Sequence, residues 1–229
     1  MNHFYEPAIL SQGFDILIFV SIIHNNKHML IQLTRLGMIG LVKLLVGAHP
    51  RWVGGEPSVA QSIYFTNHTS HLDTLALWVA LPAKIRVKTR PVAAKDYWGC
   101  GKIKRFIALK VLNAVLIDRE VSRHSDPLAP LFEALAAGDS LILFPEGTRK
   151  TQAEPSNFKG GLHHLAEAFP QVRLIPVYLD TLHRSMPKGS HFPVPLICTV
   201  RFGAALFWQA DEQKKVFLTR ARAAVLSLI

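Results

Sequence analysis

From residue 59 onward, strand-like and helix-like stretches alternate along the chain, and this alternation limits the fold more than any other feature. The stretches expected to be strands are residues 62–66, 91–94, 114–118, 140–144, 173–179 and 197–202. The stretches expected to be helices are residues 72–81, 97–112, 127–137, 161–169 and 212–226. Such alternation predicts an α/β layered domain with a largely buried mixed sheet flanked by helices.

The first 50 residues differ from the rest and are expected to form an apolar or amphipathic helical segment that associates with a membrane, with one domain at residues 51–229. An apolar run at 15–23 is too short to span a bilayer, and Gln32, Arg35 and Lys43 interrupt a longer run at 29–46. That longer run suits a poor transmembrane helix, an interfacial helix or a helix packed on the domain. We favour an interfacial helix whose Lys and Arg side chains snorkel to water. No basic segment precedes an apolar core at the start, so a cleaved signal peptide is not expected.

The charge of the chain is concentrated in one region. The formal net charge is +10, and residues 84–123 hold eleven Lys or Arg against three Asp or Glu, which accounts for eight of those ten charges. Such a region attracts phosphates, anionic lipid surfaces or acidic proteins. A mean hydropathy of +0.21 with 49% hydrophobic residues argues for contact with a membrane. Cys100 and Cys198 form no CxxC pair, which suits a reducing cytosolic setting and gives no sign of a cysteine metal site.

A histidine and an aspartate stand five positions apart between the expected strand at 62–66 and the expected helix at 72–81. A tight turn can fold the carboxylate of Asp73 back towards the imidazole of His68, with Thr69 or Ser70 as the candidate N-cap. The carboxylate would then fix the tautomer, and the second ring nitrogen could remove a proton as a general base. The alternative is a chance pair, because an aspartate suits the first turn of any helix.

A second motif, Phe144-Pro145-Glu146-Gly147-Thr148-Arg149, follows the expected strand at 140–144. Arg149 is therefore placed at the edge of the sheet, where α/β proteins bind ligands, and its planar guanidinium suits phosphate. Gly147 allows the backbone to approach a ligand closely. Lys159, before two glycines that open a helix, is a candidate for a second anion contact. The alternative is a surface turn with a solvated arginine.

Together these motifs resemble those of the glycerolipid acyltransferase family, which makes phosphatidic acid from lysophosphatidic acid. The pattern Asn67-His68-(four residues)-Asp73 precedes Phe-Pro-Glu-Gly-Thr-Arg in the family's order and at its separation, and the resemblance covers about residues 60–180. Two weaker blocks agree. Residues 113–119 fall where the family carries Gly-x-x-Phe-Ile-x-Arg, with Asn113 for the Gly and Leu116 for the Phe, and residues 175–178 resemble its Val-Pro-Val strand.

The resemblance implies an acyltransferase domain at 51–229 that moves a fatty acyl group from acyl-CoA or acyl-carrier protein to a lysophospholipid hydroxyl. His68 would be the general base and Asp73 its orienting partner. The residues that would contact the acceptor are Arg149, Glu146, Gly147, Thr148, Arg119 and Lys159. Direct attack by the acceptor agrees with the absence of a G-x-S-x-G motif, and no cofactor beyond the acyl donor is expected. Backbone N–H groups near residues 68–71 are a hypothesis for the oxyanion donors.

The expected partners are thus the lysophospholipid, the acyl donor and an anionic membrane surface, at the cytoplasmic face of the inner or plasma membrane. A lyso-aminolipid or glycerol 3-phosphate is an alternative acceptor. A non-catalytic basic module that binds membranes or nucleic acid is a second alternative. A pure binding module does not need the histidine-aspartate pair together with the Phe-Pro-Glu-Gly-Thr-Arg turn, so nucleic acid is not expected. The cations and aromatics at 97–112 suit lipid headgroups as well as nucleic acid, or a solvated amphipathic helix. His71 and the pair His163-His164 raise the question of zinc, but there is no HExxH motif and no metal is expected.

Overall fold

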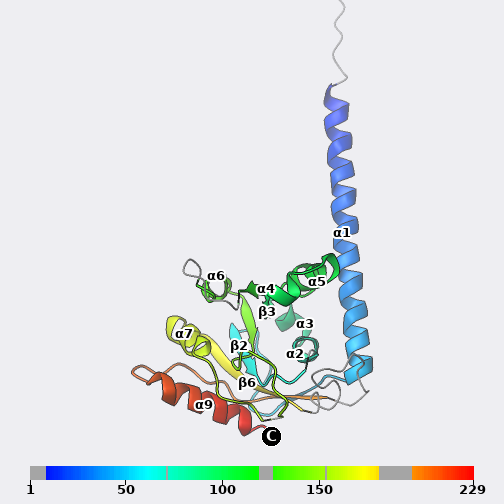
Figure 1. Ribbon diagram of the computed structural model, residues 1–229. Helices are drawn as coiled ribbons and strands as arrows, with labels where there is room; N and C mark the ends of the chain where they lie inside the picture. The colour runs from blue at the N-terminus through cyan, green and yellow to red at the C-terminus, as the bar shows by residue number, and fades with distance from the viewer. Residues whose placement is uncertain (1–8, 71, 119–125, 153, 181–197) are drawn as a thin grey trace, which may run out of the picture.

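The computed structural model describes residues 9–70, 72–118, 126–152, 154–180 and 198–229, with the backbone alone at 9–25 and 27. It confirms the expected α/β class, a mixed seven-stranded sheet with helices on both sides (Figure 1). The strands are β1 (His49–Trp52), β2 (Ser62–Thr66), β3 (Thr89–Ala94), β4 (Val115–Ile117), β5 (Ser140–Leu143), β6 (Arg173–Leu179) and β7 (Thr199–Phe202). The helices are α1 (Ile9–Val46), α2 (Asp73–Ala80), α3 (Ala83–Arg86), α4 (Lys95–Trp98), α5 (Lys102–Phe106), the π-helix η1 (Ile107–Val111), α6 (Ala129–Ala136), α7 (Gly161–Ala168) and α9 (Lys214–Leu226).

The sheet places β2 at its centre, in the order β1-β7-β6-β2-β5-β3-β4. Strand β2 runs parallel to both β5 and β6, with Ile63 opposite Leu141 on one side and Leu174 on the other. Strand β7 is antiparallel to β6, and β1 is parallel to β7. Because parallel strands end at the same edge of a sheet, the segments that follow β2 and β5 emerge side by side. The two motifs of the sequence therefore meet at that edge.

Successive residues of β2 serve two separate hydrophobic cores, as the alternation of side chains along a strand requires. Tyr64 belongs to the core on the side of α1, α2 and η1, which includes Leu77. Ile63 and Phe65 belong to the core on the side of α6, α7 and α9, which includes Phe217. All five residues of β2 are buried, so the strand that carries the histidine turn is fixed from both faces.

Helix α1 runs without a break through both apolar runs of the sequence and extends beyond the body of the protein (Figure 1). Its second half packs on the domain, where Val42 and Val46 are buried. The stretch His28–Val46 is long and apolar enough to cross a membrane, with a mean hydropathy of 1.7 and 11% of its most apolar window buried. The snorkelling expected for Arg35 is wrong, because its Nε and Nη2 donate to the carbonyl of Val111 at 3.0 and 2.9 Å. The division at residue 50 stays a prediction, and β1 straddles it.

The single helix expected at 97–112 is wrong, because the structure divides it into α4, α5 and η1. The break falls at Gly99 to Gly101, and Gly101 has φ +78°, a conformation that glycine adopts at little cost. The chain thereby turns between α4 and α5 instead of continuing one helical axis.

His163 on α7 is a buried titratable group outside the two motifs. Its ring packs edge-to-face against Trp208 and Phe217, with centroid distances of 4.9 and 5.6 Å. Burial lowers the pKa of His163 from its ordinary 6.5, and the nearby carboxylate of Glu167 opposes this only in part.

We expect the pKa of His163 to make the fold less stable in acid. The unfolded chain binds a proton on this imidazole near pH 6.5, whereas the folded protein resists it, so stability falls as the pH drops through that value. The free energy of unfolding, measured with urea at pH 7.5 and 5.5, should fall less for His163→Phe than for wild type. The control is His164→Phe, at the exposed neighbouring position. Equal acid losses in wild type and His163→Phe would contradict the prediction.

Candidate functional site

The histidine turn brings His68 and Asp73 into direct contact, as the sequence predicts. His68 follows β2 after one residue, and Asp73 is the first residue of α2. The distance from His68 Nδ1 to Asp73 Oδ2 is 2.9 Å. The carboxylate is fully buried, whereas 20% of the imidazole is exposed. With Nδ1–H donated to the carboxylate, Nε2 is the ring nitrogen left to accept a proton.

The turn is held by the carboxylate of Asp73 rather than by a capping hydroxyl. Asp73 Oδ2 also accepts the backbone N–H groups of Thr69 at 2.6 Å and Ser70 at 2.8 Å. The expectation that Thr69 or Ser70 is the N-cap is wrong, because Leu72 takes that position and no side chain caps the helix. The helix starts at Asp73, one residue later than expected.

The second motif fixes the backbone of His68 on both sides. The N–H of His68 donates to Glu146 Oε1 at 2.8 Å, and its carbonyl accepts the N–H of Lys150 at 2.8 Å. Glu146 Oε2 accepts the N–H and the hydroxyl of Ser156, at 2.9 and 2.7 Å. Glu146 is therefore a buried link between the two motifs, and it is not among the residues that line the cleft.

These contacts also bear on the oxyanion hypothesis. The N–H of His68 is donated to Glu146, and those of Thr69 and Ser70 are donated to Asp73. All three groups are therefore occupied, so the hypothesis that they stabilise an oxyanion is wrong for residues 68–70. Residue 71 lies outside the described part of the chain.

The imidazole of His68 opens into a cleft of about 360 Å³ at the carboxyl edge of the sheet. The cleft is lined by His68, Thr74, Val92, Ala93, Ala94, Tyr97, Trp98, Ile117, Asp118, Pro127, Leu143, Phe144, Gly147, Thr148, Arg149 and Lys159. The ring of Phe144 lies against that of His68, with a centroid distance of 4.2 Å and a tilt of 30°. The cleft thus joins an imidazole, two cations and the carboxylate of Asp118, which pairs with Lys95 at 3.2 Å, to an apolar and aromatic wall.

Gly147 allows the turn after β5 to form as it does. Its φ of +74° lies in the left-handed region, and a Cβ there would come within 2.9 Å of Lys159 Cδ, Cε and Nζ. The side chain of Lys159 therefore crosses directly over this glycine. The lysine from the start of α7 is in this way brought to the same cleft as Arg149.

The structure places the sequence-predicted residues as follows. Arg149, Gly147, Thr148 and Lys159 line the cleft with His68. Arg119 lies outside the described residues, and so does His71. Sequence reasoning missed Tyr97 and Trp98 as cleft residues, although two adjacent aromatics three and four positions after the end of a strand are a usable signal. Nothing in the sequence pointed to Ser156.

Asn113, which stands where the family motif has glycine, has φ +52°. Asparagine is among the few non-glycine residues that tolerate the left-handed region, so the turn before β4 survives the exchange. The carbonyl of Asn113 accepts a hydrogen bond from Arg90 Nε at 2.9 Å, and Arg90 Nη1 lies 3.1 Å from Asp139 Oδ2.

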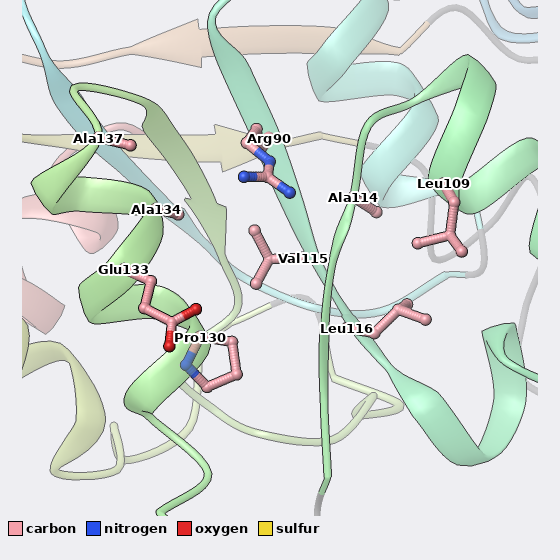
Figure 2. A pocket seen from close by; sticks show the side chains of 9 residues that line it. All are labelled: Arg90, Leu109, Ala114, Val115, Leu116, Pro130, Glu133, Ala134 and Ala137. Atoms are coloured by element: carbon pink, nitrogen blue, oxygen red, sulfur yellow. The ribbon is translucent and has the colours of Figure 1, made fainter.

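A second hollow, of about 320 Å³, lies beside the edge strand β4, and Figure 2 shows Arg90 and Glu133 among the side chains that line it. That hollow contains none of the residues of the two motifs.

Metal binding has one candidate group in the described part of the chain. The ligand atoms of His163, His164 and Glu167 on α7 all lie within 4.8 Å of one another. However, Lys214 Nζ is 3.2 Å from His164 Nε2, and an ammonium group there opposes a second cation. The group lies away from the cleft, and the expectation that catalysis uses no metal stays an expectation.

Comparison with known proteins agrees with this arrangement. The family model described as Acyltransferase matches residues 53–180. A 1-acyl-sn-glycerol-3-phosphate acyltransferase from Limnanthes douglasii is 29% identical over 168 residues, covering 71% of this chain and 56% of that protein. The mouse 1-acyl-sn-glycerol-3-phosphate acyltransferase alpha is 28% identical over 150 residues, covering 63% and 50%. A taffazin from Dictyostelium discoideum is 26% identical over 148 residues, covering 59% and 50%.

The fold also has a counterpart among solved structures. The crystal structure of the 1-acyl-sn-glycerophosphate acyltransferase from Thermotoga maritima superimposes with a TM-score of 0.67 at 18% identity, covering 96% of this chain and 87% of that one. The family model spans more than half of the chain, so the protein belongs to the acyltransferase family whose motifs the sequence resembles. The chain spans about half the length of the curated relatives that it matches.

Glu146→Ala is expected to destabilise the protein through the link between the two motifs. The change leaves three partly buried donors from His68 and Ser156 without their acceptor, and the loss of an acceptor costs roughly 1–3 kcal/mol for each donor that water does not reach. Urea denaturation should therefore show a loss of several kcal/mol, whereas Glu154→Ala, an exposed change in the same loop, should shift stability by less than about 0.5 kcal/mol. Equal effects of the two substitutions would contradict the assignment.

Proposed function

We propose that the protein transfers a fatty acyl group from an acyl thioester to the free hydroxyl of a lysophospholipid, with lysophosphatidic acid as acceptor and phosphatidic acid as product. The observation that carries this proposal is a buried carboxylate and a partly exposed imidazole, 2.9 Å apart, in one cleft with Arg149 and Lys159. Membership of the acyltransferase family supports the reaction class. The names of the relatives support the acceptor.

In the proposed reaction, His68 Nε2 removes the proton of the acceptor hydroxyl while its oxygen attacks the thioester carbonyl. Asp73 holds the ring in the required tautomer and stabilises the imidazolium that forms. When the tetrahedral intermediate collapses, the C–S bond breaks, an ester forms and the imidazolium returns its proton to the departing thiolate. No acyl-enzyme forms, so the chemistry needs no nucleophilic serine or cysteine and no cofactor apart from the acyl donor.

The cations of the cleft supply recognition of the acceptor. Arg149 offers a planar fork to two phosphate oxygens, and Lys159, whose side chain lies against Gly147, adds a point charge in the same cleft. The apolar wall formed by Val92, Ile117 and Leu143 suits hydrocarbon next to the reacting hydroxyl. A lysophospholipid has both a phosphate group and a hydrocarbon chain, whereas a polynucleotide has phosphates but no hydrocarbon chain to pack against the apolar wall.

We place the enzyme on the cytoplasmic face of a membrane, with α1 as its attachment. Where α1 passes the domain, its outer side exposes leucines at helical spacing, Leu30, Leu33, Leu41 and Leu44 among them. An apolar stripe of this kind needs a cover of lipid or protein. Acyl-CoA or acyl-carrier protein would then reach the cleft from the aqueous side.

His68→Ala should leave a folded protein whose acyl transfer is lost. Removal of a general base typically lowers the rate by about 10²–10⁴. The measurement offers labelled acyl-CoA and acyl-carrier protein with a panel of acceptors: lysophosphatidic acid, a lyso-aminolipid and glycerol 3-phosphate. The matched control is His49→Ala, on the exposed edge strand β1. An acyl-transfer rate near that of wild type in His68→Ala would contradict the mechanism. If wild type preferred another acceptor of the panel, that acceptor would replace lysophosphatidic acid in the proposal.

Arg149→Ala should raise the apparent KM for lysophosphatidic acid by about 10- to 100-fold, because a charge-assisted contact to phosphate is lost. The KM for the acyl donor should change far less. Lys150→Ala is the control, since only the backbone of Lys150 contacts His68. A larger change for the donor than for the acceptor would move the phosphate site away from Arg149.

A further inference from the structure

A short basic element with an exposed apolar residue stands beside the cleft. On α5, Lys102, Ile103, Lys104 and Arg105 are all exposed, and Ile103 keeps 76% of its surface in water. Lys110 on η1 is exposed as well. Within the described part of the chain, none of these four cations forms an ion pair, and neither α5 nor η1 carries an acidic residue.

The α5 element is connected to the cleft through the aromatic residues of α4. Lys104 Nζ lies 4.0 Å from the centre of the Tyr97 ring, which is a cation–π contact. Tyr97 and Trp98 pack edge-to-face at 5.6 Å, and both line the cleft that contains His68. Tyr97 and Trp98 therefore connect α5 with the cleft that contains His68.

The same element adjoins the apolar helix α1. The π-helix that continues α5 packs on α1, and Arg35 of α1 donates to the carbonyl of Val111 at its end. Figure 1 shows α5 beside α1, on the side of the body from which α1 extends, whereas α9 lies far from that side. The leucines on the outer side of α1 and the α5 turn thus belong to one region of the surface.

We propose that α5 docks on an anionic phospholipid bilayer, with Ile103 entering the boundary between headgroups and acyl chains and Lys102, Lys104, Arg105 and Lys110 contacting lipid phosphates. Cations without a carboxylate partner among the described residues, around one exposed isoleucine, match the two layers of such a surface, phosphate outside and hydrocarbon beneath. An acidic protein could pair with the four cations, but its charged surface would offer Ile103 no apolar contact. This inference rests on the proposed function, because it makes Tyr97 and Trp98 the entrance through which a membrane lysolipid reaches His68.

The position of residue 103 can be measured directly. Cys100 is the exposed cysteine of the described residues and Cys198 is buried, so Cys100→Ser leaves no accessible thiol there. In that background, Ile103→Cys carries an environment-sensitive fluorophore on the full chain. Val216→Cys is the matched control, because Val216 is also exposed and follows two lysines, but on α9.

The expected result is a blue shift and quenching by brominated lipid at position 103 on vesicles that contain phosphatidylglycerol, with little change on pure phosphatidylcholine and at position 216. High salt should weaken the response, because the contacts to phosphate are electrostatic. The proposal is overturned if the label at 103 stays in water on anionic vesicles. It is also overturned if position 216 responds equally, or if only an acyl-carrier protein, and no vesicle, moves the signal.

An activity measurement separates this proposal from the proposed function. The ratio of acyl-transfer rates on vesicle-embedded and on soluble short-chain lysophosphatidic acid should fall about tenfold in Ile103→Asp, which corresponds to about 1.4 kcal/mol of lost interfacial contact. Val216→Asp should leave the ratio unchanged. An unchanged ratio in Ile103→Asp overturns the docking proposal alone, whereas an absence of transfer to either substrate by wild type overturns the proposed function.

Discussion

The site depends on one oxygen atom, Asp73 Oδ2, which accepts hydrogen bonds from the imidazole of His68 and from the N–H groups of Thr69 and Ser70. These three bonds bring three consecutive residues of the chain around a single acceptor. The carboxylate is sealed from water, so no solvent molecule competes for the donors. Its place in the first turn of α2 adds the favourable field of a helix N-terminus. The orientation of the histidine is thus a property of the turn as a whole.

The sheet holds this turn from both neighbouring strands. On the β6 side, the amide of Asn67 accepts the N–H of Leu179 at 2.9 Å and donates to its carbonyl at 3.2 Å, which extends the pairing of β2 and β6 beyond the end of the strand. On the β5 side, Glu146 and Lys150 bind the backbone of His68. A histidine fastened to both neighbours keeps its position while the cleft in front of it stays open.

Much of the fold followed from local pattern, and the exceptions have identifiable causes. Strands β2 and β6 begin and end where their apolar runs do, because both are buried on two faces and polar residues mark their limits. The helix expected at 97–112 failed because two glycines outweigh the propensity of the residues around them. The expected interfacial role of Arg35 failed because its acceptor, a carbonyl 76 positions away in the chain, is invisible to any local pattern.

The same distinction applies to the site. The contact of His68 with Asp73 is local, five positions apart, and motif spacing was enough to predict it. Glu146 was expected in the acceptor pocket, but it does not line the cleft. Its Oε1 accepts the N–H of His68 after β2, and its Oε2 accepts the hydroxyl of Ser156. A sequence does not reveal these distant partners. Tyr97 and Trp98 reach the cleft only because β3 ends at the same edge as β2 and β5. Residues that act through distant partners require the topology as well as the motif.

The distribution of charge explains why a cleft beside two carboxylates can still attract an anion. Asp73 and Glu146 are 0% and 3% exposed. Asp73 Oδ2 and both oxygens of Glu146 accept from backbone N–H groups, the ring of His68 and the hydroxyl of Ser156, whereas Asp73 Oδ1 is buried and accepts from no described residue. Neither Arg149 nor Lys159 forms an ion pair with a described residue, although both lie in the cleft. If either carboxylate reached these cations, it would neutralise them and compete with an incoming phosphate. Because Asp73 and Glu146 are buried and bind donors near His68, and Asp118 at the cleft pairs with Lys95 at 3.2 Å, the positive charge of Arg149 and Lys159 stays available where a substrate arrives.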